Sequence, residues 1–142
     1  MEARQIREGI FWMGAVDWDR RLFDSLIPLP DGTSYNAYLV KGSSKTALLD
    51  TVDPSMYYQL QAQLASVERL DYVVAHHAEQ DHSGSIPAVL DKRPEASVVC
   101  SPKCKPMLIE LLHIAEERIV TADDGDAIDL GGRTLKFVHA PW

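Results

Sequence analysis

Residues 71–84 read Asp-Tyr-Val-Val-Ala-His-His-Ala-Glu-Gln-Asp-His-Ser-Gly, and the rest of the chain is organised around this stretch. Its first part, Tyr72 to Ala75, is an apolar run that predicts a short buried strand. Polar side chains follow, and Gly84 then precedes an apolar periodicity that predicts a helix reaching about Leu90. The polar residues are therefore expected on a loop between the carboxyl end of a strand and a helix. Layered α/β proteins usually place their chemistry at such loops.

Four side chains of this loop are of the metal-ligand type: His77, Glu79, Asp81 and His82. In an extended loop alternate residues share a side, so the first three are expected to face the same way, and a bend of the backbone lets His82 join them. Adjacent histidines in a polar loop are often solvated surface residues. Two imidazoles and two carboxylates directly after a buried strand nevertheless favour a metal site.

The remaining sequence predicts one domain over residues 1–142, with strands first and alternating strands and helices later. Asp53-Pro54 marks the start of the first helix, because Asp is a favoured N-cap and Pro fits the first turn. The prolines near residues 26–30 exclude a central strand there. Strands are expected within residues 6–15, 33–40, 46–51, 72–75, 96–100, 118–121, 127–130 and 134–138, and helices at 57–66, after the histidine loop to about 90, and at 102–113. Helices would cover one face of the sheet, and no second layer for the other face is visible.

The composition excludes several classes of protein. With 46% hydrophobic and 25% charged residues, the chain has the balance of a soluble globular domain. Its formal net charge of −7 argues against a nucleic-acid partner, since no basic stripe is present. No apolar run approaches the length of a membrane span. Residues 1–5 lack the core of a signal peptide, so the expected location is the cytoplasm.

Other polar residues are interpreted as structural. Cys100 and Cys104 leave a redox or zinc pair open, but the C-x₃-C spacing without a second pair favours reduced thiols. His76 is expected to point away from His77 by strand alternation. His113 ends a leucine-rich helix, where a cation suits the helix dipole. The acidic run at 123–126 fits a turn better than a calcium loop.

The pattern His77-x-Glu79-x-Asp81-His82, set between a strand and a helix, resembles the metal loop of the metallo-β-lactamase superfamily. That superfamily usually has H-x-H-x-D-H. The glutamate in place of the second histidine, followed by Ser-Gly, resembles the flavodiiron proteins, also called A-type flavoproteins or rubredoxin:oxygen oxidoreductases. The resemblance covers essentially the whole chain, because similarity to that family's N-terminal domain extends to residues 17–23, 32–39, 49–54 and 139–141.

The resemblance implies an α+β fold of the αββα type. The chain would be about the first half of a metallo-β-lactamase-like domain, with a mainly antiparallel mixed sheet and helices on one face. It also implies a diiron centre, in which His77, Glu79 and His139 ligate one iron and Asp81 and His82 the second. A carboxylate in place of an imidazole adds a hard, negative donor, which favours iron over zinc.

In the flavodiiron family, two ferrous ions reduce dioxygen to water or nitric oxide to nitrous oxide. Electrons reach the irons through FMN in a following flavodoxin-like domain and are often supplied by rubredoxin. No glycine-rich phosphate loop occurs in this chain, so we expect no flavin site in it. The resemblance does not decide between dioxygen and nitric oxide, or between iron and substituted zinc.

The chain departs from the family by stopping shortly after His139. The family's second half supplies a bridging aspartate and a further histidine. We therefore expect an N-terminal fragment that is incomplete or inactive alone. Its open sheet face would be buried by the missing half or by another chain, as in a homo-oligomer.

Two other functions stay open. One is a dinuclear zinc hydrolase, in which Asp81 would orient a metal-bound water, although the charge of Glu79 argues against it. The other is a non-catalytic remnant that only binds another subunit.

Overall fold

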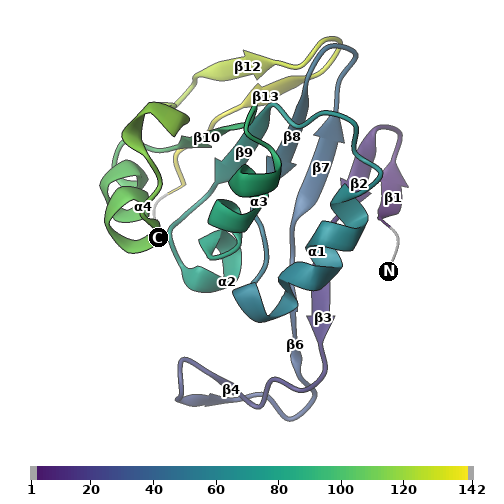
Figure 1. Cartoon of the computed structure of the whole chain (residues 1–142), viewed down its shortest axis with the longest axis vertical. Helices are drawn as coiled ribbons and strands as arrows, with labels where there is room; N and C mark the ends of the chain where they lie inside the picture. Colours follow the sequence, from purple (N-terminus) through teal and green to yellow (C-terminus); the bar gives the residue numbers. More distant parts are fainter. Residues whose placement is uncertain (1–2, 141–142) are drawn as a thin grey trace.

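A seven-stranded mixed sheet forms the body of the computed structural model, which describes residues 3–140 (Figure 1). The strands lie in the order β1-β2-β7-β8-β9-β10-β11, antiparallel from β1 to β8 and parallel from β8 to β11. Their bounds are β1 (Arg4–Arg7), β2 (Ile10–Trp12), β7 (Tyr38–Lys41), β8 (Thr46–Leu49), β9 (Tyr72–Ala75), β10 (Ser97–Cys100) and β11 (Ile119–Thr121). The predicted mixed α+β sheet is confirmed. Because parallel strands share their carboxyl edge, the segments after β8, β9 and β10 lie at one edge of the sheet.

Helices pack on one face of this sheet, as predicted (Figure 1). They are η1 (Pro54–Met56), α1 (Tyr57–Leu64), α2 (Gln80–Ser83), α3 (Ile86–Lys92), α4 (Cys104–Leu112) and η2 (Glu116–Arg118). Leu60, Ile86 and Leu108 from the helices are fully buried in one core cluster with Leu48 and Val73 of the sheet. Asp53 caps η1, which leads into α1, because its Oδ1 accepts a hydrogen bond of 2.9 Å from the backbone N–H of Ser55. The sequence placed this cap correctly.

The opposite face of the sheet has a partial cover that the sequence did not predict. A hairpin of β12 (Ala127–Asp129) and β13 (Thr134–Lys136) lies over the ends of β7 and β8. Leu130 is fully buried and forms a second apolar cluster with Val40 and Ala47. The expectation that these residues supply no second layer is therefore wrong for this part of the face. The sequence did not predict this layer because Leu130 packs against Val40 and Ala47, which are far from it in the chain.

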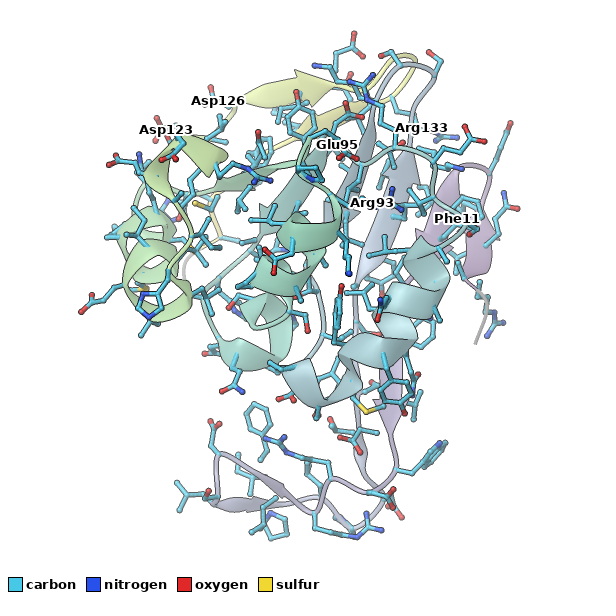
Figure 2. The ribbon with its side chains drawn as sticks, in the orientation of Figure 1. Phe11, Arg93, Glu95, Asp123, Asp126 and Arg133 are labelled. Atoms are coloured by element: carbon cyan, nitrogen blue, oxygen red, sulfur yellow. The ribbon has the colours of Figure 1, made fainter. Side chains whose placement is uncertain are left out.

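Backbone contacts hold the hairpin in place. The carbonyl oxygen of Leu130 accepts hydrogen bonds of 3.0 Å from the N–H groups of both Ser44 and Lys45. At the hairpin tip, the guanidinium of Arg133 donates to the carbonyl of Glu8 at 2.5 Å, which ties the hairpin to the turn between β1 and β2 (Figure 2). Gly42 allows this close approach, because a Cβ there would lie 1.9 Å from the Leu130 carbonyl oxygen.

A smaller arm projects from the body, at the bottom of Figure 1. It consists of two antiparallel pairs, β3 (Ala15–Asp17) with β6 (Thr33–Tyr35) and β4 (Leu22–Phe23) with β5 (Ile27–Pro28). Pro28 thus lies in a two-stranded hairpin outside the main sheet, in agreement with its exclusion from a central strand. Within the described residues, no helix has both the length and the apolarity to cross a membrane.

The close contact at Gly42 predicts how a substitution there changes the free energy of unfolding. The φ of Gly42 is not in the left-handed region, so a Gly42→Ala change alone would stabilise the chain slightly by restricting the unfolded state. The clash of the added Cβ with the Leu130 carbonyl outweighs this stabilisation. We therefore expect Gly42→Ala to lower the free energy of unfolding by roughly 1–3 kcal/mol. Urea titration measures the change.

Gly132→Ala is the matched control, because a Cβ at Gly132 meets nothing within 4 Å and only its φ of +70° opposes the change. Hydrogen exchange should show loss of protection at the Ser44 and Lys45 amides in Gly42→Ala alone. A Gly42→Ala variant as stable as the parent would contradict the packing described.

Candidate metal centre

The predicted ligand stretch joins β9 to α2 at the carboxyl edge of the parallel strands. Asp81 and His82 lie within the single turn of α2, and Glu79 is its N-cap residue with extended backbone. The expectation that all four ligand-type residues lie on a loop is therefore wrong for these two. The turn forms because Ser83 bridges it: its hydroxyl donates to the carbonyl oxygens of Ala78 and Glu79, at 2.9 and 3.0 Å.

Three of the predicted ligands come together. The rings of His77 and His82 pack edge to face with centroids 4.5 Å apart. The Nε2 atom of His82 lies 3.4 Å from Oδ2 of Asp81. Glu79 has an exposed side chain, and its backbone N–H lies 3.3 Å from Nδ1 of His77. The turn of α2 thus places two imidazoles and one carboxylate beside one another.

The organising residue of this site is Asp50, which is not among the ligands predicted from the sequence. It directly follows β8, is 7% exposed and has a left-handed φ of 57°. Its Oδ1 accepts a hydrogen bond of 2.9 Å from the N–H of His76. Its Oδ2 lies 2.9 Å from Nδ1 of His76 and 3.1 Å from Nδ1 of His82. His76, which was expected to stand apart from the site, therefore shares a carboxylate with a predicted ligand.

The electrostatics of this cluster favour an ionised Asp50. Burial alone would raise the pKa of Asp50, but the hydrogen bonds from His76 and His82 outweigh it and lower the pKa to about 2. The same hydrogen bonds raise the pKa of His76 and of His82, although burial opposes both changes. With Nδ1–H of His82 donating to Asp50, the lone pair on Nε2 is left for a metal ion.

The fifth predicted ligand, His139, lies beyond β13 and is fixed through its backbone. Its N–H donates to Oδ1 of Asp124 at 2.8 Å. Asp124 belongs to the acidic turn, in which the N–H of Asp126 donates to the carbonyl of Asp123 (Figure 2). The interpretation of this run as a turn is confirmed. His139 lines a cavity of about 730 Å³ together with His77, so the two predicted ligands border the same space.

The donor set can be tested against the metal that the resemblance implies. Among residues 3–140, no three His, Cys, Asp or Glu side chains converge closely enough to enclose an ion. The chemistry of the donors nevertheless fits iron, because imidazole nitrogens are combined with hard carboxylate oxygens. The orientation of His82 by a buried carboxylate is also typical of a histidine that binds metal.

Comparison with known proteins agrees with the fold. Residues 33–142 match the family model described as "ODP family beta lactamase". The chain is 36% identical to the coenzyme F420H(2) oxidase of Methanothermobacter marburgensis and 37% identical to the nitric oxide reductase of Moorella thermoacetica. These matches cover 98% and 96% of the chain, but only 36% and 35% of the relatives. The chain therefore spans about a third of the length of the curated relatives that it matches.

Solved structures give the same result. The rubredoxin oxygen:oxidoreductase from Desulfovibrio gigas superimposes with a TM-score of 0.89 at 33% identity, covering 96% of this chain and 35% of that one. The flavodiiron protein from Giardia intestinalis superimposes with a TM-score of 0.88 at 29% identity, covering 96% of this chain and 34% of that one.

Measurements of the free energy of unfolding test the role of Asp50. We expect Asp50→Ala to lower the free energy of unfolding by about 3 kcal/mol, because it leaves the N–H of His76 without an acceptor and places Ala in a left-handed conformation. Asp50→Asn should cost less, since Asn tolerates that conformation and keeps one acceptor. Asp91→Ala, at an exposed position of α3, is the control. Urea unfolding measures all three, and equal effects of Asp50→Ala and Asp91→Ala would refute this role.

Proposed function

We propose that this chain, which belongs to the ODP family of β-lactamase-like domains and to the flavodiiron proteins, forms part of a diiron centre that reduces dioxygen or nitric oxide. The observation that carries the proposal is the packing of His77, His82 and Asp81 at the carboxyl edge of the sheet, with His82 held by the buried Asp50. The names of the relatives, an F420H(2) oxidase and a nitric oxide reductase, support a redox function. They give no support to the zinc hydrolase.

The residues that would hold the metal follow from the sequence and the contacts together. His77, Glu79 and His139 are proposed as ligands of one iron, and Asp81 and His82 as ligands of the second. When bound, the irons would supply electrons and anchor the diatomic substrate. The protein's contribution is to hold these donors. Asp50 fixes the ring of His82 through Nδ1–H, and Asp124 fixes the backbone of His139.

Glu79 is proposed to set the choice of metal. Its carboxylate stands where the superfamily pattern has a histidine, so the site gains negative charge and an oxygen donor. Both changes favour iron over a zinc site built mainly of imidazoles. The position is also suited to movement, because Glu79 is exposed and extended at the start of α2, and its side chain can turn toward an ion without unpacking the core.

The rest of the electron path is proposed to lie outside these 142 residues. FMN in a further domain and a rubredoxin-like donor would deliver the electrons, in keeping with the larger size of the relatives. We infer that these residues alone do not sustain turnover. Steady-state oxygen consumption by the purified chain with reduced rubredoxin, above a metal-free control, would overturn that inference.

Iron binding is the direct test of the site. Under anaerobic conditions we expect the chain to bind ferrous iron, and we expect His77→Ala and His82→Ala each to weaken binding at least about tenfold. His113→Ala is the control, since His113 lies at the far end of α4. Calorimetry and metal analysis after desalting give affinity and stoichiometry. Stoichiometric zinc without iron after anaerobic purification would reject a diiron function.

A second proposal concerns the sheet face opposite the helices. Leu49, Val74, Val99 and Val120 are aligned across β8 to β11 and therefore share one face. Val74 and Val99 are buried, but Val120 is 48% exposed. Val138, which lines the same cavity as Leu49 and Val74, is 72% exposed. We propose that the second half of the domain, or another copy of the chain, covers these side chains.

This proposal predicts association of the chain in isolation. Light scattering at increasing concentration should detect dimers or larger species, because the exposed apolar side chains of Val120 and Val138 favour burial against a partner. Val120→Lys should reduce the association. Met107→Lys is the matched control, as Met107 is 52% exposed, close to the value for Val120, but lies on α4. A monodisperse monomer for the unmodified chain would count against a partner on this face.

A further inference from the structure

Thr51 is a fully buried residue that directly follows Asp50 at the end of β8. It makes two hydrogen bonds to one acceptor, the carbonyl oxygen of His82. Its N–H donates at 2.8 Å and its hydroxyl donates at 2.7 Å. A carbonyl oxygen has two lone pairs, so a single residue can occupy both of its acceptor positions. The backbone of His82 is therefore held by the segment that follows β8.

The carbonyl that Thr51 holds belongs to the end of a helix. The single turn of α2 ends at Ser83, and Gly84 is its C-cap residue. The last carbonyl groups of a helix have no partner within the helix, and side chains often supply one. Because threonine is branched at Cβ, its χ1 angle is restricted, which limits the directions that its hydroxyl can take. Thr51 thus fixes where the turn of α2 ends relative to β8.

His82 is held a second time through its side chain. Its Nδ1 lies 3.1 Å from Oδ2 of Asp50, so two consecutive residues hold the ring and the backbone of the same histidine. The contact at the ring alone would leave the turn of α2 free to rotate. The contact at the carbonyl alone would leave the ring free to change rotamer. The two contacts together define the position of the imidazole.

We propose that Thr51 is a positioning residue of the candidate metal centre. By holding the carbonyl of His82, it sets the direction of the α2 turn. It thereby keeps the ring of His82 against the ring of His77 and beside the carboxylate of Asp81. The importance of this position for iron rests on the proposed function, whereas the position itself is a property of the metal-free chain.

A simpler interpretation is that Thr51 only satisfies a buried hydroxyl. A buried polar group needs a hydrogen-bond partner, and any nearby carbonyl serves that purpose. On that interpretation, loss of the hydroxyl lowers the stability of the chain but leaves the ring of His82 in place. The two interpretations therefore differ in the position of His82 in a folded variant without the hydroxyl.

Three variants separate these interpretations. Thr51→Val replaces the hydroxyl by a methyl group and keeps the branched shape and the backbone N–H. Thr51→Ser keeps the hydroxyl donor and should restore the behaviour of the unmodified chain. Thr46→Val is the matched control, since Thr46 is also buried but lies at the opposite end of β8. Circular dichroism checks that each variant is folded.

NMR of the metal-free chain with labelled histidine measures the position of His82, at a pH where the imidazoles are neutral. His77→Ala shows how much of the His82 chemical shift comes from the neighbouring ring, whose centroid is 4.5 Å away. In Thr51→Val we expect the His82 signal to move most of the way toward its value in His77→Ala. Thr51→Ser and Thr46→Val should keep the value of the unmodified chain. An unchanged His82 signal in Thr51→Val would overturn the proposal.

Ferrous iron binding, measured anaerobically by calorimetry, tests the consequence for the metal. We expect Thr51→Val to bind iron about tenfold more weakly than the unmodified chain, as for other groups that orient a metal ligand. Thr51→Ser and Thr46→Val should bind with unchanged affinity. Unchanged affinity in Thr51→Val would refute a role of this residue toward the metal. If the unmodified chain binds no iron while the His82 signal still moves in Thr51→Val, the diiron function is wrong and the positioning of His82 by Thr51 is retained.

A measurement on the unmodified chain decides the case in which Thr51→Val does not fold. The hydroxyl proton of Thr51 should exchange with water slowly enough to give its own NMR signal, because it is buried and hydrogen-bonded to His82. A hydroxyl proton that exchanges rapidly would show that this bond does not hold the turn of α2, and would overturn the proposal.

Discussion

The carboxylate of Asp50 is the constraint on which the candidate site depends. It is buried where β8 ends, and its two oxygens accept from the backbone of His76 and contact the rings of His76 and His82. Its own N–H donates to the carbonyl of Val74, which continues the pairing of β8 with β9. The next residue, Thr51, donates to the carbonyl of His82 through both its N–H and its hydroxyl. One short segment after β8 therefore holds both ends of the predicted metal loop.

Burying a charge is unfavourable unless hydrogen bonds replace the lost water. Asp50 meets this condition only when the loop after β9 is folded back toward β8. The loop and the carboxylate thus stabilise each other, and the left-handed backbone at Asp50 is tolerated because the surrounding contacts require it. The same arrangement sets the orientation of His82, so folding and the orientation of a predicted metal ligand depend on one interaction.

Most elements of the fold could be predicted from the sequence, whereas the contacts that complete the site could not. The apolar run at Tyr72 and the cap at Asp53 depend on near neighbours, and both appear in the structure. The candidate ligands His77, Asp81 and His82 were predicted from their residue types and spacing, and their side chains lie beside one another in the structure. Asp50 was not predicted as a site residue, because its hydrogen-bond partners His76 and His82 are 26 and 32 positions away in the chain. The one signal that could have revealed it is an acidic residue at the end of a buried strand.

The order of the sheet has a consequence for how the chain folds. In the parallel half, each strand from β8 to β11 pairs with the next one along the chain, and helices form the crossover between each pair of strands. In the antiparallel half, β2 must meet β7 across the whole projecting arm. Because loop closure is cheaper for contacts that are near in sequence, β8 to β11 can assemble as one cooperative unit before β1 and β2 join. The scaffold of the metal loop would then be the earliest part of the molecule to become native, and the antiparallel edge the first to open.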